Sequence, residues 1–135
     1  MSNVELLRSV LAKAYEEPEA YFDLLDPDVE WDVRDTASPE AAIYHGPEEV
    51  RAFYRRWSGA FSDWSFQIER LIDAGDSVVA FVTERGHGRG SGAEVEMKRA
   101  NVTTFRDGRI VRFRSFSSRA AALESVGLEA DGSQA

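Results

Sequence analysis

The sequence has 135 residues, of which 43% are hydrophobic and 30% charged, and this balance predicts one globular domain with a sizeable core. The net charge of −8 argues against binding nucleic acid, because neutralising a phosphate backbone takes clustered cations. No stretch approaches the roughly 18 consecutive apolar residues of a membrane span. The absence of cysteine excludes disulfides and favours a cytoplasmic location.

Three helices and one strand are predicted in the first half of the chain. Apolar residues at helical spacing predict a helix over residues 3–15, and a proline suits the first turn of a second helix over 18–25. Strict alternation predicts a strand over 29–33, which a loop over 35–45 follows. A third helix over 46–61 carries a stripe of aromatic side chains, namely Phe53, Tyr54, Trp57 and Phe61.

The second half predicts four strands and a last helix. Alternating residues predict strands over 66–72 and 77–87, and a hairpin over 97–116 turns at Asp107-Gly108, a pair that accepts the positive φ of a tight turn. Ser118 suits the cap of a final helix that Gly127 ends, and residues 128–135 are expected to fray. The order α-α-β-α-β-β-β-β-α predicts an α+β domain over residues 1–127, in which an antiparallel sheet wraps a long helix.

Four segments of the chain, in their order, resemble the nuclear transport factor 2-like superfamily and, within it, the SnoaL-like (polyketide cyclase-like) proteins. They are residues 28–31 (DVEW), 45–54 (HGPEEVRAFY), 73–79 (DAGDSVV) and 105–110 (FRDGRI). The resemblance implies a cone-shaped fold whose curved sheet encloses a hydrophobic pocket, often with a homodimer formed through the outer sheet face. It leaves function open, because this fold hosts isomerases, hydrolases, cyclases, dehydratases and binding modules.

Aromatic residues supply the predicted pocket lining. Trp31 and Val33 share one face of their strand, and Tyr54, Trp57 and Phe61 share one face of their helix. The alternative is that these side chains only form core.

The hairpin has two possible registers. In a regular register, Phe113 belongs to an apolar face and Asn101 lies opposite Arg114 on a polar one. The family resemblance instead turns Met97, Asn101 and Ser115 toward the pocket, which requires a β-bulge to change the parity.

The strand over 77–87 ends in the candidate catalytic pair Arg85 and His87. Alternation places both on the face of Phe81, and they approach the pocket mouth if Phe81 points inward. This strand resembles that of limonene-epoxide hydrolases, in which an Arg works with two Asp residues. Here His87 and Ser115 stand at those Asp positions, and that family's water-holding residues are lost, so its mechanism is not expected. His87 could still act as a general base near neutral pH; the alternative is a solvent-exposed histidine.

Other chemistries find little support. The catalytic carboxylates of ketosteroid isomerases fall near Val33 and Asn101, and Asp35 could supply a base only if the following loop folds inward. The two histidines form no metal-binding motif, so neither a metal nor another cofactor is expected.

Two hypotheses follow. The first is a proton-transfer enzyme, an isomerase, cyclase or dehydratase, that acts on an apolar or polyketide-like carbonyl compound, with His87 as acid or base and Arg85, Asn101 and Tyr54 orienting the ligand. The second is a non-catalytic ligand-binding or dimerisation module. Much of the arginine content falls between Arg85 and Arg119, and this asymmetry suits an anionic small ligand or a charged dimer seam.

Overall fold

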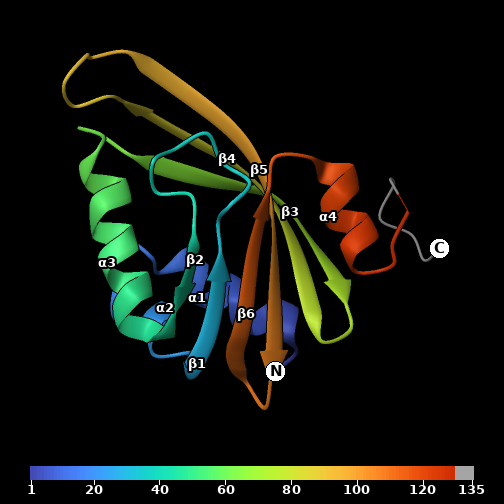
Figure 1. The fold of residues 1–135 in the computed structure, drawn as a ribbon. Helices are drawn as coiled ribbons and strands as arrows, with labels where there is room; N and C mark the ends of the chain where they lie inside the picture. Colours follow the sequence, from blue (N-terminus) through green and yellow to red (C-terminus); the bar gives the residue numbers. More distant parts are fainter. Residues whose placement is uncertain (130–135) are drawn as a thin grey trace.

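The computed structural model describes residues 1–129 and has the α+β architecture predicted from the sequence (Figure 1). The elements in chain order are α1 (Asn3–Ala12), α2 (Pro18–Phe22), β1 (Leu25–Asp32), β2 (Ile43–His45), α3 (Gly46–Gly59), β3 (Ser65–Ala74), β4 (Ser77–His87), β5 (Glu94–Arg106), β6 (Arg109–Phe116) and α4 (Arg119–Ser125). The predicted order is confirmed, with one addition. The short strand β2 lies in the predicted loop, because three residues are too few to show an alternating pattern.

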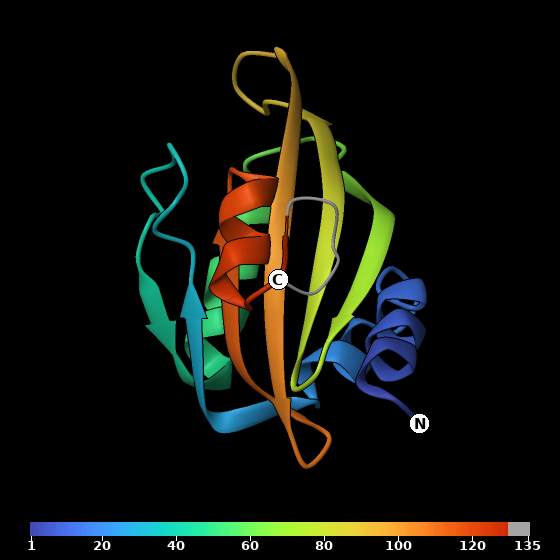
Figure 2. The ribbon, with the colours of Figure 1, turned by 90° about the vertical axis from the view of Figure 1, so that its right-hand side faces the viewer.

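All six strands belong to one curved sheet in the order β2-β1-β6-β5-β4-β3. Four neighbouring pairs are antiparallel, but β1 pairs with β6 in parallel, so the sheet is mixed rather than antiparallel throughout. The two strands are far apart in the chain, and no tight turn constrains their relative direction. The β4–β5 hairpin extends beyond the other strands (Figures 1 and 2).

The sheet has a hydrophobic cluster on each face. On the inner face, α3 packs against strand residues that include Val29, Trp31 and Phe113. On the outer face, α4 covers the centre of the sheet, where Ala122 and Leu123 pack on a second set of strand residues (Figure 2). That second set is Ile72, Val79, Phe81, Ala100 and Val102.

The ends of α4 are those expected from the sequence. The Ser118 hydroxyl accepts a hydrogen bond from the Ala121 N–H at 3.1 Å, and Gly127 adopts a φ of 76° just after the helix. Leu128, the first residue of the predicted frayed tail, is 8% exposed and packs in the outer cluster. Residues 130–135 of the predicted frayed tail lie outside the described residues. Within the described part of the chain, no helix is long and apolar enough to cross a membrane.

A β-bulge in β6 sets which side chains face inward. Phe105 pairs with Ile110, but Thr104 pairs with Arg112, so Val111 is an extra residue in β6. Asn101 therefore lies opposite Ser115 rather than Arg114. The regular register is wrong and the bulged one is right.

The side chains of β4 point alternately to the two faces of the sheet. Residues 77–83 are all buried, because α4 covers one face and the other points toward α3. Phe81 packs in the outer cluster and does not point toward the pocket. The condition under which Arg85 and His87 would approach the pocket mouth is therefore not met. The even-numbered residues Ala80, Val82 and Glu84 face the interior instead.

Candidate functional site

A cavity of about 480 Å³ lies between α3 and the inner face of the sheet. Its wall is mostly apolar and contains the sequence-predicted residues Trp31, Val33, Tyr54, Trp57, Met97, Asn101, Phe113 and Ser115. Phe61 is not among the lining residues; its ring packs beneath Gly86, where an added Cβ would meet it at 3.1 Å. The volume falls in the range of small-molecule sites, roughly 300–1,000 Å³.

Stacked aromatic rings form one wall of the cavity. The Trp31 ring is parallel to that of Phe113, with centroids 3.8 Å apart, and meets the rings of Tyr21 and Tyr54 edge-on. The indole N–H of Trp31 is buried and finds no hydrogen-bond partner among the described residues. Burial raises the pKa of the Tyr21 and Tyr54 phenols, so both stay neutral and able to donate.

Glu84 is the most unusual polar group in the cavity wall. The indole nitrogens of Trp57 and Trp64 both donate to its Oε1, at 3.1 and 3.0 Å. Desolvation by burial raises the pKa of Glu84, and this effect outweighs the two hydrogen bonds and the charge of Arg99, which favour the ionised form. A carboxyl group with a raised pKa can exchange a proton closer to neutral pH than an exposed glutamate can.

Arg99 and Asn101 follow one another along the inner face of β5. The Arg99 guanidinium donates to the Ser115 hydroxyl at 3.0 Å and to the Asp35 carbonyl oxygen. Asn101 lines the cavity and lies opposite Ala80, with its Oδ1 buried and unpartnered among the described residues. The unpartnered oxygen can only accept a hydrogen bond, and the amide nitrogen, which can donate, also makes no hydrogen bond within the described residues.

Asp35 does not offer a free base to the cavity. Its carboxylate accepts hydrogen bonds from the backbone N–H and the hydroxyl of Ser117, at 2.8 and 3.0 Å. The backbone hydrogen bond from Ser117 is the main reason that the pKa of Asp35 is lowered. These bonds hold Asp35 just beyond the ends of β1 and β6, so the loop does not carry it inward as a free base.

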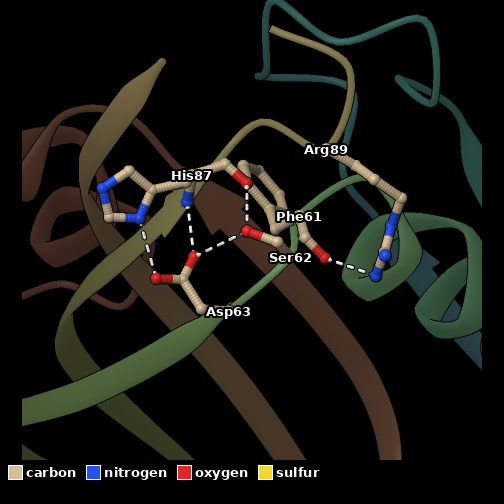
Figure 3. Close-up of polar contacts among 5 residues, drawn as sticks. All are labelled: Phe61, Ser62, Asp63, His87 and Arg89. Atoms are coloured by element: carbon tan, nitrogen blue, oxygen red, sulfur yellow. Dashed lines mark hydrogen bonds and ion pairs between the residues drawn. The ribbon is translucent and has the colours of Figure 1, made fainter. Parts of the chain in front are cut away.

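Arg85 and His87 do not line the cavity. Arg85 forms an exposed ion pair with Glu96 at 3.0 Å, and the His87 Nδ1 lies 2.7 Å from a carboxylate oxygen of Asp63 (Figure 3). The other Asp63 oxygen accepts from the His87 backbone N–H at 2.6 Å, so Asp63 ties the segment after α3 to the end of β4. Ser62 lies beside this pair and makes no hydrogen bond to the imidazole in Figure 3, so the three side chains do not form a catalytic triad. A catalytic role for His87 stays a prediction.

We expect this pair to strengthen the fold at acid pH. The hydrogen bond to Asp63 raises the pKa of His87, so its contribution is present below the ordinary histidine pKa of about 6.5 and is lost as pH rises through the raised value. In an NMR titration, Asp63→Asn should lower the His87 midpoint. An unchanged His87 midpoint would contradict the pairing.

The main polar residues of the cavity wall, Glu84 and Arg99, were not predicted as site residues. Glu84 follows Val78, Ala80 and Val82 at alternate positions of β4, and a single charge at the end of an apolar face is a signal visible in the sequence. The signal was ambiguous because the opposite face of β4 is equally apolar. Within residues 1–129, no group of three or more His, Cys, Asp or Glu side chains could hold a metal ion.

The profile of the SnoaL-like domain matches residues 8–113, and the chain therefore belongs to the SnoaL-like family. This confirms the resemblance stated from the sequence. None of the proteins with curated descriptions matches the chain.

Solved structures agree on the fold. An NTF2-like protein from Burkholderia thailandensis is 26% identical, with a TM-score of 0.78 over 86% of this chain and 90% of that one. TerC, co-crystallised with polyporic acid, is 20% identical, with a TM-score of 0.71 over 92% and 97%. A candidate SnoaL-like polyketide cyclase from a Jannaschia species is 17% identical, with a TM-score of 0.70 over 86% and 88%. At such identities, the latter two support the fold alone.

Proposed function

We propose that the protein is a proton-transfer enzyme, an isomerase, cyclase or dehydratase, that acts on an apolar carbonyl compound, with Glu84 as the group that moves the proton. The observation that carries this proposal is the half-buried carboxyl of Glu84, held by two indole N–H groups in the wall of a mostly apolar cavity. The family and its candidate cyclase relative are consistent with this chemistry. We assign the role of acid or base to Glu84 instead of His87, because His87 does not line the cavity.

The hydrogen bonds of Glu84 suit the carboxylate to this role. Both indoles donate to the same oxygen, Oε1, so the carboxylate is held in place while its second oxygen is available to a ligand. In the proposed step, this oxygen takes a proton from the carbon next to a ligand carbonyl. The electron pair of the broken C–H bond then moves toward the carbonyl oxygen, and the protonated Glu84 returns the proton to another atom of the same ligand.

The developing oxyanion needs hydrogen-bond donors within the cavity. The amide nitrogen of Asn101 and the guanidinium of Arg99 line the same inner face as Glu84, on the neighbouring strand. Donors fixed in advance around a developing oxyanion contribute about 3–4 kcal/mol each where this has been measured in other enzymes. The neutral phenol of Tyr54 is a further donor in the wall.

Exchange of carbon-bound hydrogen in D₂O tests the proposal without knowledge of the natural substrate. Bicyclic ketones such as 1-tetralone fit a cavity of this size, and mass spectrometry detects deuterium next to their carbonyl. We expect the protein to accelerate exchange above the buffer rate. Glu84→Gln should then lower the enzymatic rate by about 10²–10⁴-fold, the usual effect of a general base.

Two comparison variants serve as controls for the effect of Glu84→Gln on exchange. Glu124→Gln removes an exposed carboxylate on α4, far from the cavity wall, and should leave the exchange rate unchanged. His87→Ala separates the two candidate bases: loss of exchange in this variant and retention in Glu84→Gln would assign the base to His87 and overturn the proposal. Ketones that bind without any exchange would identify a binding module instead.

A further inference from the structure

The charges in the cavity wall differ in sign from the charge of the whole protein. Five charged side chains line the cavity, three arginines and two glutamates, whereas the chain carries a net charge of −8. They are Glu19, Arg51, Arg55, Glu84 and Arg99. The wall therefore carries a positive excess even with both glutamates ionised, and protonation of Glu84 increases it.

Two of the three arginines are already engaged by other residues. The Arg51 guanidinium forms an ion pair with Glu19 at 2.6 Å and lies over the Phe22 ring. Arg99 is held by the Ser115 hydroxyl and the Asp35 carbonyl oxygen. Arg51 therefore already has a counter-charge, and two of the Arg99 nitrogens already have neutral acceptors.

Arg55 is different, because no hydrogen bond, ion pair or ring contact to its side chain occurs within residues 1–129. It is exposed and also lines the cavity, which places it at the opening. It lies four residues after Arg51 on α3, at a spacing that brings like charges together on a helix surface. Glu19 already offsets the charge of Arg51, so an anion at the opening would pair with Arg55, which has no partner within the described residues.

We propose that the ligand of this cavity is an anion. Its apolar part, of the size of a small aromatic molecule, fills the cavity, and its acid group binds the Arg55 guanidinium at the opening. The inference deepens the proposed function, since it names the ligand class of the same cavity, but it concerns binding and not the proton-transfer step. Arg55 thereby selects acids over neutral compounds of the same shape. A guanidinium is well suited to this role because it stays charged and can bind a planar acid group with two hydrogen bonds.

A pair of fluorescent dyes tests this preference directly. 1-Anilinonaphthalene-8-sulfonate and N-phenyl-1-naphthylamine share one aromatic body, and only the first carries an acid group. We expect the wild-type protein to bind the sulfonate more tightly than the neutral dye, and 0.5 M NaCl to reduce the difference. Arg55→Ala should weaken sulfonate binding about fivefold, the effect of one solvent-exposed charge pair, and change binding of the neutral dye less than twofold.

Arg8→Ala is the matched control, since Arg8 is also an exposed helical arginine but does not line the cavity. It should change neither dye. Equal affinities for the two dyes, or an equal loss in Arg55→Ala and Arg8→Ala, would overturn the anion preference and leave the proton-transfer proposal standing. If neither dye binds, the anion proposal fails, whereas the proton-transfer proposal is still decided by the exchange experiment with the smaller 1-tetralone. Loss of exchange activity in Glu84→Gln with the dye preference intact would support both.

Discussion

Trp31→Ala is expected to lower the free energy of unfolding by about 3–5 kcal/mol, the usual cost of deleting a large aromatic side chain from a core. Trp31 is fully buried, stacks on Phe113 and contacts two tyrosines at their edges. The loss should lie at the upper end, because the vacated space joins an existing cavity and the surroundings cannot collapse to fill it. Urea denaturation followed by circular dichroism measures the change.

Trp31→Phe is the control for this prediction. It keeps an aromatic ring against Phe113 and removes the buried indole N–H that has no partner in the described chain. We expect it to cost clearly less than Trp31→Ala, because an aromatic ring still fills most of the space and no hydrogen bond is lost. If Trp31→Phe were as costly as Trp31→Ala, the indole N–H would have to make an interaction that this structure does not contain.

Glu84→Gln is expected to slow proton transfer by about 10²–10⁴-fold and, at neutral pH, to make the protein more stable. Burial raises the pKa of Glu84 in the folded state, so the folded protein binds the proton more tightly than the unfolded chain does. Stability therefore falls as pH rises from the ordinary glutamate pKa, about 4.3, through the raised value. Glutamine keeps an acceptor for both indoles and carries no charge to desolvate.

The pH dependence of this gain is the critical measurement. The stability difference between Glu84→Gln and wild type should be largest above the raised pKa and should shrink toward acid pH, where the carboxyl is neutral in both states. Thermal unfolding at a series of pH values, with Glu124→Gln as the control, would show this. A glutamine variant that is less stable at neutral pH would mean that the ionised carboxylate is held favourably, and Glu84 would not be poised to exchange a proton.

Much of the fold could be predicted from the sequence because its signals are local. Alternation and the Asp107-Gly108 turn locate β4, β5 and β6, and Ser118 and Gly127 mark the ends of the last helix. The strand β2 and the parallel pairing of β1 with β6 depend on contacts between distant parts of the chain, and no local pattern reports them. The bulge at Val111 was expected only through the family resemblance.

The site was predictable where an element has one buried face and not where both faces are buried. The aromatic stripe of α3 and the alternation of β1 led to Tyr54, Trp57, Trp31 and Val33, which line the cavity. In β4 the apolar residues continue without a break, so alternation could not distinguish the face of Arg85 from the face of Glu84. The choice depends on α4, which covers the Phe81 face only once the chain is folded.

Because both faces of β4 are buried, its alternate residues are under two different evolutionary constraints. Odd-numbered positions such as Val79 and Phe81 meet α4, whereas even-numbered positions such as Ala80 and Val82 meet whatever occupies the cavity. Mutations at the even positions can therefore change the shape and polarity of the cavity wall, while the surface on which α4 packs is preserved. A lineage of such proteins could diversify its ligands one alternate residue at a time, on a strand whose other side keeps the domain intact.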